Sequence, residues 1–425
     1  MMKDEAIYFR KFFPSISLHN KKVLRFTCIG NGLELYNYSL YGVMVPFLSL
    51  HFFPADHKNF SITMGYLSFA FALFIAPFGS IFWGWIGERY GRLSLLQNSL
   101  AFMALPTLGI ALLPSFSTIG YWAPVLLFIL RLVQGLSASG EVFGSRLYAM
   151  ESLQEKHHGI ASGYVSASGG IGVVLSMLMG LFITRYGEFY ENLWRVPFLV
   201  GVLFYAFSFY IRYSYAQDLR KVPSLMKRIS QNTETSLWSL LKSTPRESFI
   251  VFLLSAFLGS FSYMFLVFLN PFLIGQGVDG QKTFLMCTIG LLTTAVVSIL
   301  WGYYQDYVQA LDKLLSNFFK VFLACFPILF LCLLSKNFSA TLLSYILLGM
   351  FLGIFTTLSA VKTYRIFDTS TRCRGAMFNY AFGCSLFGGL TPYSLKILGE
   401  ISYFLPGVVF FVFTMIIFSL FKKFE

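Results

Sequence analysis

The stretch YAQDLRKVPSLMKRISQNTETSLWSLLKSTP, residues 215–245, is the longest polar segment of the chain. Six long apolar runs precede it and six follow it. A polar, basic segment between two equal sets of apolar runs is typical of a linker outside the membrane. We therefore predict a first six-helix bundle over residues 1–214, a cytoplasmic linker over 215–245 and a second six-helix bundle over 246–425.

The apolar runs have the length of membrane-spanning helices, which need about 20 residues to cross about 30 Å of hydrocarbon. They occupy residues 24–50, 61–86, 94–113, 120–146, 158–184, 194–214, 246–273, 281–303, 316–335, 339–363, 373–397 and 400–421. Only 12% of all residues are charged, whereas a soluble domain has about a quarter. The alternation of period two that barrel strands need is absent from these runs. These features predict an all-α polytopic membrane protein with twelve transmembrane helices.

The net charge of +13 follows the topology that these helices imply. With both termini in the cytoplasm, about 25 of the 32 Lys and Arg residues fall on inner segments. This positive-inside bias accounts for the positive net charge as a feature of membrane topology, with membrane lipids as the surroundings. We therefore expect no nucleic-acid partner. The N-terminal stretch MMKDEAIYFRKFF has no cleavage signal, so the first apolar run is expected to be retained.

The reactive residue types give no sign of an enzyme. The six cysteines are scattered, without the spacing of a metal site or a disulfide framework. The five histidines belong to no recognisable catalytic triad. We therefore expect no catalytic residue, no metal and no cofactor. The short outer loops favour a small-molecule ligand over a protein ligand, and we expect a monomer.

The loop GWIGERYGRL, residues 84–93, joins the second and third apolar runs. A glycine at position 91 permits a tight turn between two helices. The carboxylate of Glu88 can pair with guanidinium groups or with a helix N-terminus on the other side of the bundle, which would hold one conformation closed. The loop resembles the signature of the major facilitator superfamily. Its matching positions, which we predict to form a conformational latch, are Gly84, Glu88, Arg89, Gly91 and Arg92.

The fourth apolar run resembles one particular branch of that superfamily. RLVQGLSASGEVFGSRLYAME, residues 131–151, is similar to the metabolite–proton symporter branch of that superfamily. This branch includes carriers of osmoprotectants, citrate, α-ketoglutarate and shikimate. Further similarity lies in the segment Trp194–Phe198 and in the eleventh run at Arg374, Gly375, Asn379 and Pro392. The resemblance covers nearly the whole chain and implies two six-helix bundles that alternate access to a site between them.

The sequence departs from that branch in places that bear on mechanism. The second-half loop WGYYQDYVQALDK, residues 301–313, keeps Gly302 and Asp306 but lacks the Gly-Arg ending, which predicts a latch on one side only. The segment DLRKVPS, residues 218–224, replaces a Glu-x-Pro segment. Position 37 holds Asn where the branch usually has an acid.

Two helices present polar faces inside the predicted membrane. On the first, Thr27, Asn31, Glu34, Tyr38 and Tyr41 share one side. On the fourth, Arg131, Gln134, Ala138, Glu141, Ser145 and Tyr148 share an arc. A buried carboxylate balanced between desolvation and a nearby cation can take up and release a proton. We therefore predict proton coupling by Glu34 and Glu141. A permanent ion pair of Arg131 with either carboxylate is the structural alternative.

The substrate-binding candidates extend over both halves. They are Asn31, Asn37, Tyr38, Tyr41, Arg131, Gln134, Tyr263, Asn270 and Asn379. The favoured function is a proton-coupled symporter that imports a small organic metabolite, with a carboxylate preferred, across a bacterial inner membrane. The alternatives are uptake of a betaine- or proline-like zwitterion, transport of a carboxylate siderophore, an exporter or facilitator without proton coupling, and a receptor that does not transport.

Overall fold

The computed structural model describes residues 18–54, 58–186, 192–220, 237–369 and 371–424. The described chain is helical throughout its long elements, and the expected all-α architecture is confirmed. The long helices are α2 (Leu18–Phe52), α3 (Lys58–Arg89), α4 (Arg92–Leu112), α6 (Trp122–Ser152), α7 (His158–Tyr186), α8 (Val196–Arg220), α11 (Pro245–Tyr263), α13 (Gly280–Val308), α14 (Leu311–Leu334), α15 (Phe338–Ile366), α16 (Arg372–Ile401) and α17 (Leu405–Phe424). Each begins or ends within several residues of a predicted apolar run.

Ten helices of the described chain are long and apolar enough to cross a membrane. The other two long helices, α2 and α16, have 35 and 30 residues but carry more polar side chains. Both pack extensively against other long helices, and the polar groups of their middle turns, such as Glu34 on α2 and Asn379 on α16, are buried. A polar membrane helix is tolerated where its polar groups face protein rather than lipid.

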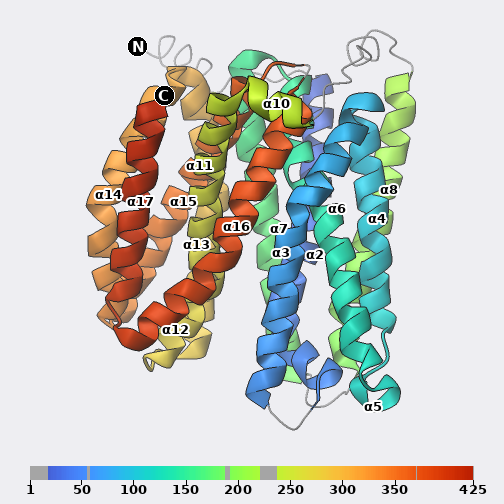
Figure 1. Ribbon diagram of the computed structural model, residues 1–425, viewed down its shortest axis with the longest axis vertical. Coiled ribbons are helices and arrows are strands. Elements are labelled where there is room, and N and C mark those ends of the chain that lie inside the picture. The colour runs from blue at the N-terminus through green and yellow to red at the C-terminus, as the bar shows by residue number, and fades with distance from the viewer. Residues whose placement is uncertain (1–17, 55–57, 187–191, 221–236, 370, 425) are drawn as a thin grey trace, which may run out of the picture.

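The long helices form two groups in space (Figure 1). Helices α2 to α8 make the first bundle and helices α11 to α17 make the second. Helix α2 begins and α17 ends at the same end of the molecule, which we call the inner end. The two bundles lie closest there and diverge toward the end that carries α5 (Phe116–Ile119) and α12 (Leu269–Gly275).

Several short elements were not expected from the sequence. A helix α10 (Leu237–Ser243) lies within the predicted linker, whose residues 221–236 lie outside the described part of the chain. A π-helical turn, Met264–Phe268, separates α11 from α12. Such turns are frequent at functional sites. The boundaries of the two predicted bundles as folding units stay a prediction.

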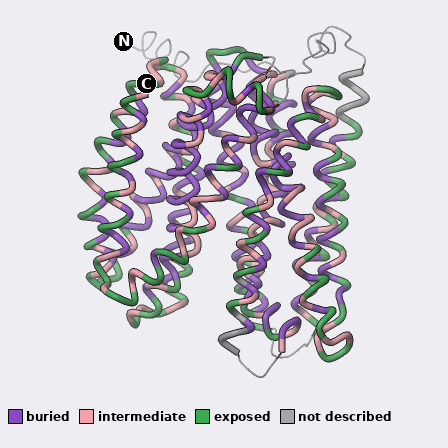
Figure 2. The backbone as a smooth tube through the Cα atoms, viewed as in Figure 1, coloured by how far each residue is buried: buried purple, intermediate pink, exposed green. Residues whose placement is uncertain are grey.

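The two bundles have different cores. The second bundle is filled by phenylalanine rings in edge and stacked contacts, including Phe257, Phe318, Phe322, Phe355 and Phe410. The first bundle instead buries charged side chains along its axis. Figure 2 shows the buried positions concentrated inside each bundle and where the bundles meet, with exposed positions on the outer faces. Most of the buried charges therefore lie in the first bundle.

Glycines let neighbouring helices touch through their backbones. A Cβ atom on Gly172 of α7 would lie 2.0 Å from the carbonyl oxygen of Gly32 on α2. At the boundary between the bundles, a Cβ atom on Gly159 would lie 2.5 Å from the carbonyl oxygen of Gly302 on α13. Small residues at such contacts are typical of membrane helices, because close approach replaces the missing hydrophobic driving force.

Replacing Gly172 by alanine should destabilise the first bundle. The added methyl group has no space against Gly32, and overpacking of this kind costs about 1–3 kcal/mol. The melting temperature of the purified protein in detergent should fall. Gly275→Ala is the matched control, because nothing lies within 4 Å of its added Cβ. Equal melting temperatures for the two variants would contradict the assigned contact.

Candidate functional site

Arg131 is one of two fully buried arginines in the described part of the first bundle. It lies on α6 and is fully buried. Its Nη1 donates to Oε1 of Gln134 at 2.6 Å, and Nε2 of Gln134 donates to Oγ1 of Thr107 on α4 at 2.9 Å. The Nε and Nη2 atoms of Arg131 have no hydrogen-bond partner among the described residues. A buried guanidinium with two unused nitrogens is suited to receive an acidic group.

Aromatic rings surround this guanidinium. Its Cζ lies 3.9 Å from the ring centre of Tyr41 and 5.6 Å from that of Phe69. Phe69 lies 6.1 Å from the ring of Tyr263, which belongs to α11 of the second bundle. The ring of Tyr38 lies 6.4 Å from Phe69 and close to Tyr263. The structure thus brings Tyr38, Tyr41 and Tyr263 together with Arg131, at a point where both bundles contribute.

Glu34 is buried on α2, and neither of its carboxylate oxygens has a hydrogen-bond partner in the described chain. The Tyr205 hydroxyl on α8 lies close to this carboxylate and to the hydroxyl of Thr107. Thr107 accepts from Gln134, so a row of polar groups leads from Arg131 to Glu34. Leaving a buried polar group without a hydrogen bond costs about 1–3 kcal/mol, which marks such groups for a ligand, a proton or water.

Glu141 does not belong with Arg131. Its carboxylate pairs with Arg212 of α8, whose Nη1 donates to Oε2 at 2.9 Å and whose Nη2 donates to Oε1. The alternative of a permanent pair between Arg131 and Glu34 or Glu141 is therefore wrong for this structure. Sequence reasoning missed Arg212, although a cation inside a predicted span is by default a functional candidate.

Two predicted binding residues hold helices together in this structure. Asn31 donates to the carbonyl of Val165 on α7 at 2.8 Å and accepts from Ser145 on α6 at 3.1 Å. Asn37 donates to the carbonyl of Gly201 on α8 at 3.4 Å. The amide of Asn31 is thus engaged with neighbouring helices through both its nitrogen and its oxygen. Asn37 also donates to the carbonyl of Leu33 on its own helix at 3.0 Å, and its Oδ1 has no hydrogen-bond partner in the described chain.

Two further candidates lie away from Arg131. Asn270 accepts from the Tyr345 hydroxyl at 2.7 Å inside the second bundle. Asn379 donates to the carbonyl of Gly375 on its own helix at 2.8 Å. The structure does not bring either residue to the Arg131 group, and no contact in the described chain gives them a shared site.

The inner end is closed by contacts between the bundles. Glu88, in the last turn of α3, accepts from the backbone N–H of Arg374 at 3.0 Å and pairs with the Arg374 side chain. Arg374 lies in the first turn of α16, so the carboxylate meets both a helix N-terminus and a guanidinium. A Cβ atom on Gly84 would lie 3.2 Å from Cα of Arg374, so this glycine allows the approach.

A second carboxylate makes the equivalent contact from the other bundle. Asp306, near the end of α13, accepts from the backbone N–H groups of Gly159 and Ile160 at 2.7 and 2.8 Å. These groups belong to the first turn of α7. The prediction of a one-sided latch is therefore wrong, because the contact needs only Asp306 and a glycine at the helix start, both of which this sequence has. We call the contacts of Glu88 and Asp306 the inner latch.

The remaining residues of the predicted latch have local roles. Gly91 adopts φ 90°, a conformation that favours glycine, at the turn between α3 and α4. Arg92 pairs with Glu151 of the same bundle at 3.0 Å and donates to the carbonyl of Gly87. Arg89 is exposed and lies over the rings of Trp85 and Tyr90. Arg89 and Arg92 therefore shape the turn without crossing to the second bundle.

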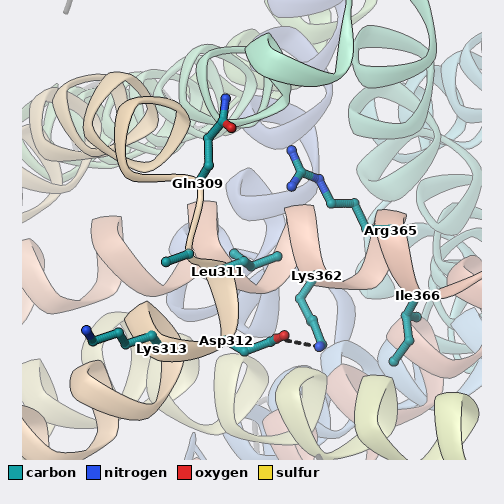
Figure 3. Close-up of a pocket in the computed structure, with 8 residues that line it drawn as sticks. Gln309, Leu311, Asp312, Lys313, Lys362, Arg365 and Ile366 are labelled. Carbon is teal, nitrogen blue, oxygen red and sulfur yellow. Dashed lines mark hydrogen bonds and ion pairs between the residues drawn. The ribbon is translucent and has the colours of Figure 1, made fainter.

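A cavity of about 350 Å³ lies at the inner end of the second bundle, between α14 and α15 (Figure 3). It is lined by Gln309, Ala310, Leu311, Asp312, Lys313, Lys362, Arg365 and Ile366. Lys362 pairs with Asp312, and Arg365 donates to the carbonyl of Glu155 at 3.0 Å. None of the predicted binding residues lines this cavity. Across the described ranges, no group of His, Cys, Asp and Glu side chains could hold a metal ion.

Comparison with known proteins places these features in a family. The model of the Major Facilitator Superfamily matches residues 27–392. The chain is 28% identical over 392 residues to a Staphylococcus aureus (strain COL) protein named "Putative proline/betaine transporter", with 88% of this chain and 80% of that protein covered. It is also 28% identical over 214 residues to the "Proline/betaine transporter" of Escherichia coli (strain K12), with 50% of this chain and 42% of that protein covered.

Among solved structures, the chain is similar to the proton:xylose symporter XylE bound to 6-bromo-6-deoxy-D-glucose. The TM-score is 0.72 at 15% identity, with 95% of this chain and 94% of that chain covered. A double Trp mutant of XylE gives a TM-score of 0.74, also at 15% identity, with 96% of each chain covered. At this identity the likeness shows the fold alone.

Removing either carboxylate of the inner latch should favour opening of the inner end. Loss of one charge-assisted contact shifts such an equilibrium by about 1.5–3 kcal/mol, or about ten- to a hundredfold. Cys373 is fully buried beside the latch and can report the change. With the other cysteines replaced by serine, maleimide should label Cys373 faster in Glu88→Gln and in Asp306→Asn.

Asp312→Asn serves as the control for this experiment. Asp312 pairs with Lys362 inside the second bundle and does not cross to the first. Its variant should label Cys373 at the parental rate. A labelling rate that stays unchanged in both latch variants would show that these carboxylates do not keep the inner end closed.

Proposed function

Because the chain belongs to the major facilitator superfamily and is a multi-pass transporter of the bacterial inner membrane, we propose that it imports a small organic carboxylate together with protons. The protein is a transporter and not an enzyme. The substrate would bind between the two bundles, and alternating access would expose it first to one side of the membrane and then to the other.

The guanidinium of Arg131, which is only partly hydrogen-bonded, carries this proposal. Two of its nitrogens lack hydrogen-bond partners in the described chain, and the residue is fully buried. Guanidinium matches a carboxylate through two parallel hydrogen bonds, which are strong where water is excluded. Tyr263 would let the second bundle sense the bound substrate, because its ring lies beside Phe69 of the first bundle.

Glu34 supports the proton-coupled part of the proposal. It is a carboxylate buried inside the protein, without a hydrogen bond from the described residues. A charged carboxylate in such a place is costly, so its protonation state can depend on whether the site opens to the outside or to the inside. The row through Tyr205, Thr107 and Gln134 offers a path by which substrate on Arg131 can influence Glu34.

A zwitterion is the second candidate substrate. Relatives of this chain are named proline/betaine transporters. A betaine has both a carboxylate for Arg131 and a cationic nitrogen, and aromatic rings attract such cations. The rings of Tyr38, Phe69 and Tyr263 lie close to the guanidinium and could hold that end.

Arg131→Gln should weaken substrate binding by about 1.5–3 kcal/mol, or about ten- to a hundredfold, because a desolvated charge-assisted contact is lost. The measurement is competition of a carboxylate panel and a betaine panel against labelled substrate. Arg185→Gln, at the exposed outer end of α7, is the control and should bind normally. Normal carboxylate binding by Arg131→Gln would refute the assignment, and competition by betaines alone in wild type would favour the zwitterion.

Glu34→Gln should abolish accumulation driven by a pH gradient, because a neutral amide cannot take up and release the coupling proton. Counterflow, in which labelled and unlabelled substrate exchange without net proton movement, should persist. Reconstituted vesicles with and without a pH gradient measure both activities. Glu400→Gln, at an exposed position near the end of α16, is the control. Wild-type accumulation and pH dependence in Glu34→Gln would remove this residue from the coupling mechanism.

A further inference from the structure

Helices α2 and α8 pack with a regular antiparallel register along the core of the first bundle. Tyr36 donates to the carbonyl of Pro197, and Asn37 donates to that of Gly201. One turn toward the inner end, Glu34 faces Tyr205. The register continues at Gly30, where an added Cβ would lie 1.9 Å from Nη2 of Arg212.

Arg212 therefore occupies a place built for it. It is fully buried, and its guanidinium lies in the space left by Gly30 on α2. It donates to the carbonyl of Leu96 on α4 and to both oxygens of Glu141 on α6. Arg212 itself comes from α8, so four helices meet at this guanidinium.

Of the two buried carboxylates in this region, one is paired with Arg212 and the other is not. Glu141 and Arg212 neutralise each other at two hydrogen bonds. Glu34 lies about one helical turn from Gly30 and interacts electrostatically with both Glu141 and Arg212. Neither of its oxygens is hydrogen-bonded to Arg212. The titratable groups facing Glu34 in the described chain are Tyr38 on its own helix, Glu141 from α6, and Tyr205 and Arg212 from α8.

This arrangement has a consequence for which carboxylate can exchange protons. A buried carboxylate held by two charge-assisted hydrogen bonds stays ionised, whereas an unpaired one is stabilised by taking up a proton. If Glu141 were neutral, Arg212 would be an uncompensated buried cation with Glu34 as the nearest remaining acid. Arg212 would then pair with Glu34 and hold it ionised.

We propose that Arg212 is a positioning residue that keeps Glu141 permanently paired and thereby leaves Glu34 free to carry the coupled proton. The inference rests on the proposed proton-coupled transport and sharpens it, since it removes Glu141 from the proton-carrying role and gives it a protective one. Arg212 touches neither Arg131 nor the substrate position, so its effect runs through the state of Glu34.

The test compares Glu141→Gln, Arg212→Gln, the double variant and Arg212→Lys in reconstituted vesicles. Glu141→Gln should lower pH-driven accumulation at least tenfold while counterflow persists, because the released Arg212 captures Glu34. The double variant should recover accumulation relative to Glu141→Gln, because it has no free cation. Arg212→Lys should retain coupling, because the charge on Glu141 is still matched. A purely structural role would reduce counterflow and accumulation together.

A second measurement is independent of transport. The melting temperature of Arg212→Gln should rise as pH is lowered, because its unpaired Glu141 is stabilised by a proton. The double variant should show no such added dependence on pH. Glu141→Gln should melt lower than wild type, because Arg212 loses its two hydrogen bonds to Glu141 and can be compensated only by ionising the buried Glu34.

The outcomes separate this inference from the proposed function. If wild-type accumulation is insensitive to a pH gradient, the proton-coupled function fails, while the melting curves still judge the Arg212–Glu141 assignment. Wild-type accumulation by Glu141→Gln would overturn the inference. So would a folded double variant that fails to regain accumulation, or melting curves of Arg212→Gln that match those of the double variant.

Discussion

A charge inside the hydrocarbon of a membrane is costly unless it is paired or used, and this constraint organises the protein. The first bundle buries Glu34, Arg131, Glu141 and Arg212, and only Glu141 and Arg212 satisfy each other. The second bundle avoids the problem with a core of phenylalanine rings. One bundle thus holds these four buried charges, and the other is packed mainly through apolar rings.

The boundary between the bundles includes two kinds of contact that can be broken without leaving charges in lipid, beside others such as the hydrogen bond from Arg146 to the Tyr380 hydroxyl. Glycine backbones touch at Gly159 and Gly302. When this contact forms again after opening, no polar side chain has to lose its water. Glu88 and Asp306 bind the first turns of helices α16 and α7 at the inner end, where water can replace the lost hydrogen bonds. The strong polar contacts are therefore placed at the end where breaking them is least costly.

Much of the fold could be predicted from the sequence, because apolar runs of membrane length and a polar linker are local patterns. Arg131 and Glu34 could be found for the same reason, since each is an unusual residue within its own helix. The partner of Glu141 could not, because it depends on how α8 packs against α6. Asn31 was assigned to the right face of its helix, but only the packed structure shows that Val165 and Ser145 occupy its amide.

The difference between the cores of the two bundles also affects which sequence changes such a protein can tolerate. Phenylalanines packed in a mutually supporting cluster, such as Phe257 with Phe318 and Phe322, tolerate conservative apolar exchange because the cluster keeps its volume. Tyr38, Tyr41 and Phe69 surround Arg131 but lie outside that cluster. If Arg131 holds the substrate as proposed, a few replacements around this one arginine would change the substrate while the packing of the opposite bundle stays the same.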